Sequence, residues 1–409
     1  MLIIVILLKI SLINCNLNIS DTANKIRYLL NSCKNSRFRR CSANAKLDNF
    51  VSKTLDVLER TEYIGDYLKN LNVSQCPNKS LQSDNYINEH IFNGMPLHKD
   101  VPDSHWQEYK KVYKKQYTSR CHEKSALSTW KENLRKVIEH NRLFLDGKLT
   151  FSLNLNHFGD LGEADYFKNI LKLIDTVPLF DPAEDHHRSA FRRNAHVRVP
   201  RKVDWRARGF KPKLEEQWHC GACYAFAVTH ALQAQLYRKH GDWRELSPQQ
   251  IVDCSYTDGN MGCDGGSLRA ALRYVTREGL TSELHYPYIG KKGFCHYNRL
   301  FKHVKPRRWA MLPFGDEAAM ERALATIGPL AVAINAAPFT FQLYRSGIYD
   351  DPFCIPWELN HAMLLVGYTR QYWILLNWWG KNWGEDGYIR IRRGFNRCGV
   401  ANMAAYVEL

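Results

Sequence analysis

Apolar residues recur at steps of three and four along residues 217–239, which is the pattern of a helix with one buried face. The apolar positions are Ala225, Val228, Leu232 and Leu236. A polar turn that contains Gly221 comes directly before them. The spacing therefore predicts an amphipathic helix that begins at Cys223.

Two other stretches carry helix signals. Ser247 is followed by Pro248 and then by Gln250, which is a capping box with proline in the first turn. Earlier in the chain, a second apolar and amide-bearing face repeats at three- and four-residue steps. Its members are Trp130, Asn133, Val137 and Asn141. Both patterns predict helices with a buried side.

Short runs rich in aliphatic residues follow in the second half of the chain. They are residues 329–335, 362–368 and 372–377, and an alternating run at 388–392. These runs predict strands. Helix signals gather in 217–285 and strand signals in 329–407, so we expect an α+β fold with a helical half and a sheet half. A ligand cleft is expected in the groove between the halves.

The position of Cys223 at the start of its helix favours a reactive thiolate, because free N–H groups and the helix dipole stabilise negative charge there. Such a nucleophile needs a base and a group that orients the base. His361 stands just before one predicted strand, and Asn377 ends another. The alternative is a buried structural cysteine.

Residues 220–224, CGACY, match the cysteine signature C-G-[SA]-C-[WY], and His361 and Asn377 lie 138 and 154 residues after Cys223. Over residues 105–409 the chain resembles the papain-like cysteine proteases, in particular the cathepsin L-like enzymes. The resemblance implies their two-domain fold, with a helical left half, a β-barrel-like right half and the active-site cleft between them. It also implies a cysteine endopeptidase without metal or organic cofactor.

The resemblance assigns the roles by position. Cys223 would be the nucleophile and His361 its base and later its acid. Asn377 would fix the imidazole tautomer, and Gln217 would donate to the oxyanion hole. Trp379, with Trp383, would cover the histidine–asparagine contact.

The resemblance also places substrate contacts. Gly265 and Gly266 would form a backbone strip for an extended peptide. Four apolar residues would line the pocket for the second residue before the cut: Leu268, Ala333, Leu359 and Met403. Trp379 would also contact substrate. We expect Leu, Val or Phe in that pocket, although core packing alone would explain the four. No insertion resembles an occluding loop, which favours an endopeptidase.

The region from Val199 on contains seven cysteines, an odd number that suits a disulfide-stapled thiol enzyme. The resemblance implies the pairs Cys220–Cys263, Cys254–Cys295 and Cys354–Cys398, with Cys223 free. A zinc site is not predicted, since the spacing Cys220-x-x-Cys223 has no matching second pair. The adjacent His186 and His187 are interpreted as solvated side chains.

The chain divides into five expected parts. Residues 1–15 form a secretory signal peptide, residues 16–104 an extension of unknown function with helical spacing, residues 105–165 an inhibitory propeptide, residues 166–198 a linker with a cleavage region near 195–199, and residues 199–409 the peptidase. The propeptide is similar to its family counterpart at the helix face named above and at Asn156, Phe158 and Asp160. It would lie through the cleft in the direction opposite to substrate.

The extension carries glycosylation sequons at Asn18, Asn72 and Asn78. Its cysteines at 33, 41 and 76 could pair with one another or with Cys121, and the sequence does not choose among these pairings.

The net charge of +16 is scattered over the chain without a long basic run. We therefore expect a solvated surface and no nucleic-acid partner. The interpretation is a monomer without membrane attachment after signal removal, which enters the secretory pathway and acts in lysosomes or outside the cell on protein and peptide substrates, with its own propeptide as inhibitor.

Three residues depart from the family pattern: Trp218 replaces glycine, Tyr224 replaces tryptophan, and Trp378 replaces serine. Two alternative functions stay open, the first of them because of Trp218 and Trp378. One is a catalytically silent papain-fold binding protein, and the other is a transpeptidase or ligase that uses the same cysteine, histidine and asparagine.

Overall fold

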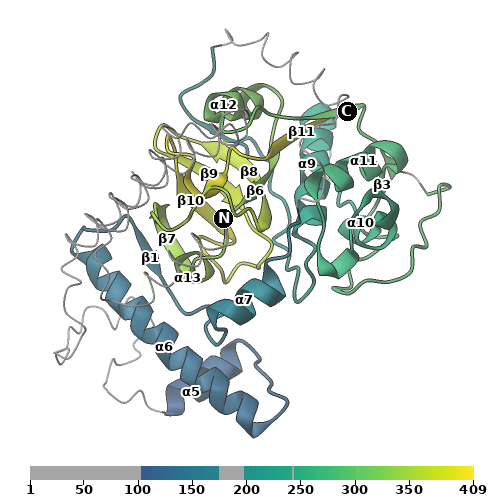
Figure 1. Cartoon of the computed structure of the whole chain (residues 1–409). Helices are drawn as coiled ribbons and strands as arrows, with labels where there is room; N and C mark the ends of the chain where they lie inside the picture. The colour runs from purple at the N-terminus through teal and green to yellow at the C-terminus, as the bar shows by residue number, and fades with distance from the viewer. Residues whose placement is uncertain (1–102, 175–197, 242–243, 302) are drawn as a thin grey trace, which may run out of the picture. The chain divides into compact units, whose positions relative to one another are not determined.

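The computed structural model describes residues 103–174, 198–241, 244–301 and 303–409, all within one compact unit (Figure 1). The expected signal peptide, residues 16–102 of the extension, its sequons and three cysteines, the paired histidines at 186 and 187, and most of the cleavage region lie outside the described residues. Nothing below concerns those segments.

The expected propeptide is built on two helices that contact each other through aromatic side chains. Its elements are α5 (Asp103–Val112), α6 (Arg120–Leu145), β1 (Phe151–Leu153) and α7 (Glu163–Ile170). Trp106 of α5 meets Trp130 of α6 with ring centroids 5.6 Å apart. The predicted face of α6 is confirmed, because all four of its residues are buried.

Polar residues on the α6 side hold the backbone of the turns that follow. Asn141 donates to the Leu153 carbonyl at 2.9 Å and accepts from the Leu153 N–H at 2.8 Å. These two bonds fix β1 against α6. Asp160 accepts hydrogen bonds from Tyr109 and Tyr117 and pairs with Lys115 at 2.7 Å. The buried amides and carboxylate are therefore satisfied, as buried polar groups must be.

The helical half surrounds α9. Its elements are α9 (Cys223–His240), α10 (Pro248–Cys254), η1 (Tyr256–Asp258), η2 (Gly262–Asp264), α11 (Leu268–Glu278), and the strand pair β3 (Leu280–Thr281) and β4 (His303–Val304). Figure 1 shows α9 between the sheet and the helices α10 and α11.

The expectation that α9 is amphipathic is wrong, because every residue from Cys223 to Leu236 is buried. The helix lies in the middle of the molecule and needs no solvent face. Two of its buried amides have internal acceptors: Gln233 donates to the Arg244 carbonyl and Gln235 to the Ile327 carbonyl. A central helix of this kind can combine apolar and polar positions all round when each amide is bonded.

The capping box is half formed. Ser247 accepts from the Gln250 N–H at 3.0 Å, as predicted for the start of α10. The Gln250 side chain does not return to Ser247, however. It bonds the Tyr274 hydroxyl, the Gly279 carbonyl and the Thr281 N–H instead. Tertiary partners have replaced the local one.

The sheet half contains the remaining elements: β2 (Val203–Asp204), β5 (Arg308–Met311), α12 (Glu317–Thr326), β6 (Leu330–Ile334), α13 (Phe339–Gln342), β7 (Tyr344–Tyr349), β8 (His361–Tyr368), β9 (Tyr372–Leu376), β10 (Tyr388–Arg392), η3 (Arg397–Gly399) and β11 (Ala404–Glu408). The strand order is β1-β7-β10-β9-β8-β6-β11-β5, with β2 beside β8. All pairs are antiparallel except β7 with β10.

The strand order shows that this half is an open sheet and not the barrel-like form that was expected. A barrel needs every strand to pair on both sides. Within the described residues, β1 pairs only with β7 and β5 only with β11, so the sheet stays open at both ends. One of these end strands belongs to the propeptide, which therefore extends the sheet of the peptidase.

Candidate active site

Cys223 is the first residue of α9 and its side chain is fully buried. Backbone hydrogen bonding by Ala362, Tyr224 and Cys223 itself acts to lower the pKa of the thiol. Ala362 directly follows His361, so the helix start and the β8 start meet at this sulfur. Burial nevertheless raises the pKa of the Cys223 thiol to about 12. The expected thiolate is thus disfavoured while the propeptide covers the groove.

His361 begins β8, and its Nε2 lies 2.8 Å from the Oδ1 of Asn377. Its Nδ1 has no hydrogen-bond partner within the described part of the chain. Burial lowers the pKa of the imidazole to about 4. The ring stacks on Trp379 at 4.8 Å, and Trp383 meets Trp379 edge-on at 5.0 Å. The indoles therefore cover the histidine–asparagine contact, where the sequence pattern expected them.

Gln217 is buried beside the start of α9 and its side-chain amide points at the propeptide. Its Nε2 donates to the Cys220 carbonyl at 3.0 Å and reaches the Ile170 carbonyl at 3.4 Å. Ile170 ends α7 of the propeptide. A backbone carbonyl of the inhibitor therefore lies at the donor expected to bind a substrate oxyanion.

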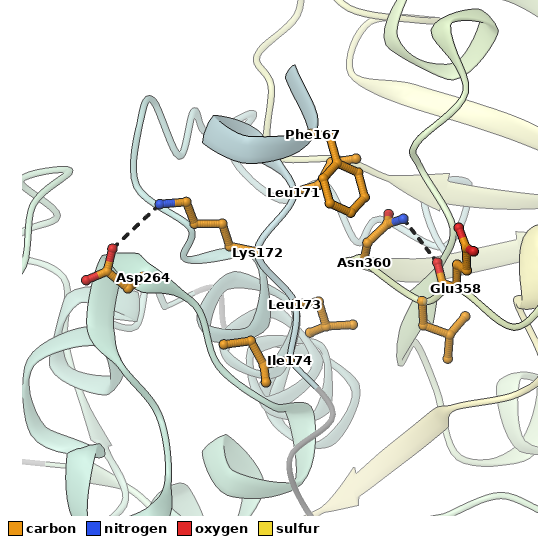
Figure 2. A pocket seen from close by; sticks show the side chains of 9 residues that line it. Phe167, Leu171, Lys172, Leu173, Ile174, Asp264, Glu358 and Asn360 are labelled. Atoms are coloured by element: carbon orange, nitrogen blue, oxygen red, sulfur yellow. Dashed lines mark hydrogen bonds and ion pairs between the residues drawn. The ribbon is translucent and has the colours of Figure 1, made fainter. Parts of the chain in front are cut away.

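The groove is filled by residues 171–174, which directly follow α7 (Figure 2). The Leu173 N–H donates to the Asn360 carbonyl of the sheet half at 3.1 Å, and the Ile174 N–H donates to the Gly266 carbonyl of the helical half at 2.9 Å. Sequence reasoning placed this segment in the linker that begins at 166. Its two backbone bonds join both walls of the cleft.

Two glycines make room for this segment. A Cβ added at Gly265 would lie 2.1 Å from the Lys172 carbonyl oxygen, and Gly265 has φ +115°. A Cβ at Gly221 would lie 2.6 Å from the Lys172 Cβ. The backbone strip predicted at Gly265 and Gly266 therefore contacts an extended peptide, although that peptide is the inhibitor.

A pocket of about 450 Å³ opens beside the same segment (Figure 2). Its lining comes from the propeptide and from both walls: Phe167, Leu171, Lys172, Leu173, Ile174, Asp264, Glu358, Leu359 and Asn360. Lys172 and Asp264 pair across it at 3.6 Å. The pocket belongs to the cleft rather than to a separate site.

The four residues expected at the apolar pocket come from four places in the fold. Leu268 begins α11, Ala333 lies in β6, and Met403 directly precedes β11. The Ala333 N–H donates to the Met403 carbonyl at 2.8 Å. Leu359 lies in the lining of the groove pocket, whereas the other three are fully or almost fully buried and lie outside that lining. Their contact with substrate stays a prediction.

Three disulfide bonds join Cys220 to Cys263, Cys254 to Cys295 and Cys354 to Cys398. These are the pairs that the resemblance implies. Among the described residues, two cysteines are free, the buried Cys223 and the exposed Cys121. The described ranges hold no cluster of three or more potential metal ligands. They also contain no helix with the length and apolar character needed to cross a bilayer.

Comparisons with known proteins agree with this geometry. The profile of the papain family cysteine proteases matches residues 199–408, and that of the cathepsin propeptide inhibitor domain matches residues 106–166. Cathepsin L of Sarcophaga peregrina is 37% identical over 75% of this chain and 93% of its own length. The chain belongs to the papain family of cysteine proteases.

Relatives in the family carry the same two-part organisation. Cathepsin L1 of Drosophila melanogaster is 36% identical over 75% of this chain and 85% of its own length. The structure of the digestive procathepsin L 3 from the larval midgut of Tenebrio molitor matches with a TM-score of 0.68 and 33% identity, over 76% of this chain and all of that one. This papain-family chain is therefore a cysteine endopeptidase made as a zymogen, and its own propeptide is the inhibitor.

The indole at the family departure Trp218 packs on Tyr288 and Gly290, next to the expected oxyanion donor Gln217. Trp218 has φ +51°, a conformation that glycine adopts freely and bulky residues rarely do. Its indole turns to Tyr288, at 5.6 Å between rings, and covers Gly290. The Tyr288 hydroxyl donates to the Gln217 carbonyl at 2.9 Å. The side chain therefore packs away from the Gln217 amide.

Sequence reasoning missed several residues of the site. Tyr166 donates to the Ala336 carbonyl and packs on Trp379, which anchors α7 over the groove. Asn360 holds the inhibitor segment on the sheet wall. Neither residue type is distinctive alone. They could have been found only by knowing how the propeptide runs through the cleft.

Proposed function

We propose that Cys223 is the nucleophile, His361 its acid and base, Asn377 the residue that orients the imidazole, and Gln217 an oxyanion donor. The observation that carries the proposal is the His361–Asn377 bond of 2.8 Å, which leaves Nδ1 without a hydrogen-bond partner in the described part of the chain. A ring nitrogen held in this way can accept the proton of a neighbouring thiol.

The reaction is acyl transfer in two steps. The Cys223 sulfur attacks the peptide carbonyl carbon, and the C–N bond breaks as the His361 imidazolium gives its proton to the leaving amine. Water then attacks the thioester, with His361 taking its proton, and the thiol is restored. Gln217 and the Cys223 N–H stabilise the oxyanion formed in each step.

The propeptide keeps both reacting groups neutral. Burial raises the pKa of Cys223 to about 12 and lowers that of His361 to about 4. Removal of residues 166–174 opens the groove to water, which reduces both penalties, and the N–H groups at the start of α9 then favour the thiolate. A mechanism-based epoxide should label Cys223 in the processed protein and not in the intact zymogen. Labelling of both forms, or of neither, would contradict the proposal.

Acid is expected to loosen the propeptide through His140 and His157. Burial lowers the pKa of His140 to about 4 and that of His157 to about 3, the latter helped by the charge of Lys115. Both histidines are neutral when the propeptide is docked. The stability that depends on their neutral form is present above pH 6.5, the ordinary histidine pKa, and is lost as the pH falls toward the lowered pKa values. Each protonation costs about 1.4 kcal/mol per pH unit below 6.5.

The test uses a Cys223→Ser zymogen, which cannot process itself. Its melting temperature should fall steeply between pH 6.5 and 4, and His157→Phe should flatten the fall. His122→Phe is the matched control, since His122 is exposed on the same helical region of the propeptide. Equal pH dependence in the two variants would contradict the role of His157.

Substrates with an apolar second residue before the cut should be preferred. Leu268, Ala333, Leu359 and Met403 would line that pocket and offer no partner for a charge. A leucine peptide is therefore expected to exceed its lysine analogue in kcat/KM by at least about tenfold. Leu359→Glu should reduce this leucine-to-lysine ratio of kcat/KM. As a control, leucine is exchanged for lysine four residues further along the peptide, and that ratio should be the same for Leu359→Glu and the wild-type enzyme.

We propose hydrolysis rather than ligation, because no feature of the described groove excludes water from the acyl side once the propeptide leaves. Product analysis on a peptide cleaved in the presence of an added amine separates the two activities. The silent-scaffold alternative predicts no cleavage at all.

We further propose a monomer of the secretory pathway, lysosomal or extracellular, with peptide substrates and no nucleic-acid partner. The three disulfides support an oxidising compartment. The scattered net charge of +16 supports a solvated surface. Size-exclusion chromatography of the processed protein tests the monomer.

A further inference from the structure

Trp378, which stands where the related proteases usually have serine, is fully buried between the nucleophile helix α9 and the histidine strand β8. On the helix side its indole stacks on Phe226 with 5.4 Å between ring centroids and a 23° angle. It also lies 4.6 Å from the His230 ring, one turn further along α9.

On the strand side the indole N–H donates to the Ala362 carbonyl at 2.9 Å. Ala362 is therefore held by the indole edge. Because Ala362 follows His361 in β8, this bond fixes the strand where the imidazole is attached.

The Trp378 backbone contacts the other two members of the site. Its N–H donates to the Asn377 Oδ1 at 2.8 Å, and its carbonyl accepts from the Gln217 N–H at 2.9 Å. Asn377 Oδ1 is thus shared between His361 and Trp378. One residue touches the helix of the nucleophile, the strand of the base, the orienting amide and the oxyanion donor.

On the α9 side, the His230 ring that contacts the indole is itself held by hydrogen bonds. His230 is 1% exposed, its Nδ1 lies 3.0 Å from the Phe226 carbonyl, and its Nε2 lies 3.1 Å from Glu215. The Glu215 carbonyl accepts from the Gly380 N–H at 3.2 Å. The imidazole is bonded at both nitrogens and cannot turn away from the indole without breaking a buried bond.

We propose that the Trp378 indole is a positioning residue, which sets the separation between the Cys223 helix and the His361 strand. This inference rests on the proposed roles of Cys223 and His361. The indole acts as a spacer because its ring packs on Phe226 and His230 of α9 while its N–H is bonded to Ala362 of β8. Proton transfer between sulfur and imidazole depends steeply on their distance, so a shift of about 1 Å in this spacer lowers the rate rather than the affinity for substrate.

The decisive variant is Trp378→Phe, which keeps an aromatic ring but removes the N–H bond to Ala362. The matched control is Trp373→Phe in β9. Trp373 is also fully buried, and its indole N–H donates to Glu317 at 3.0 Å. Within the described residues, its indole makes no hydrogen bond to Cys223, His361, Asn377 or Gln217. Both variants lose one indole hydrogen bond in the same half of the molecule, so both lose stability by a similar route.

Each full-length variant is expressed as zymogen, processed in trans by the wild-type enzyme, separated from it by a tag, and normalised by active-site titration. Trp378→Phe should lower kcat by about tenfold or more with KM changed less than about twofold. The acid limb of the rate of Cys223 alkylation by iodoacetate should move to higher pH, because a looser pair ionises less readily. Trp373→Phe should change neither quantity beyond about twofold.

Phe226→Leu gives a second route to the same result, since it removes the stacking partner on α9 and leaves the indole in place. It should shift the alkylation profile in the same direction as Trp378→Phe. The proposal would be overturned if Trp378→Phe had the melting temperature, the kcat and the alkylation profile of the wild-type enzyme. The roles of Cys223 and His361 are tested separately, because the pH profile of alkylation in the wild-type enzyme must follow an ionising pair. Failure of those roles is therefore distinguishable from failure of the role proposed for Trp378.

Discussion

The Cys223→Ala chain is expected to accumulate as an unprocessed zymogen and to cleave no peptide. The substitution removes the only atom proposed to form the acyl intermediate, and losing one member of such a unit costs on the order of 10⁶-fold in kcat. Acidified protein followed on a gel measures self-processing. A fluorogenic peptide with leucine before the cut-site residue measures cleavage after processing in trans.

Cys121→Ala is the matched control for this prediction. It deletes the same atom at the exposed free cysteine of α6 and should leave self-processing and cleavage unchanged. Residual self-processing in purified Cys223→Ala protein would assign the chemistry to another residue.

Gln217→Ala is expected to lower kcat by about 10²–10³-fold with little change in KM, because it removes one oxyanion donor. The structure places that donor at an inhibitor carbonyl, 3.4 Å from Ile170. The same substitution should leave the alkylation of Cys223 by iodoacetamide unchanged, since that reaction forms no tetrahedral oxyanion.

Gln235→Ala controls for the loss of a buried amide. Gln235 also lies buried, and its Nε2 bonds one backbone carbonyl, that of Ile327, at 2.9 Å. A decrease in kcat of the same size in both glutamine variants would mean that the effect of Gln217 is structural.

The predicted division into a helical and a sheet half could be made from periodicity alone, because strand and helix signals occupy separate parts of the chain. The Cys223, His361 and Asn377 set could be recognised because residues 220–224 match the cysteine signature of the papain-like proteases and the histidine and asparagine follow near that family's spacing. Each of the three also stands at the end of a patterned element. End positions are where a short side chain can reach a cleft while its element stays in the core.

Three features could not be predicted for physical reasons. The burial of α9 on all sides depends on which elements surround it, and Gln233 and Gln235 look like surface residues until their backbone partners are known. Closure of the sheet depends on pairing between distant strands. The groove segment at 171–174 is only four residues long, so its pairing with Asn360 and Gly266 leaves no periodic pattern.

The pairing of β1 with β7 has a consequence for the matured enzyme. In the zymogen, Phe151 lies opposite Gly347 and its ring meets Tyr349 at 4.7 Å. Excision of the propeptide strips this cover and leaves a row of backbone groups that a foreign strand can bind. The uncut chain is therefore the better form to hold at high concentration, because β1 keeps this edge of the sheet paired.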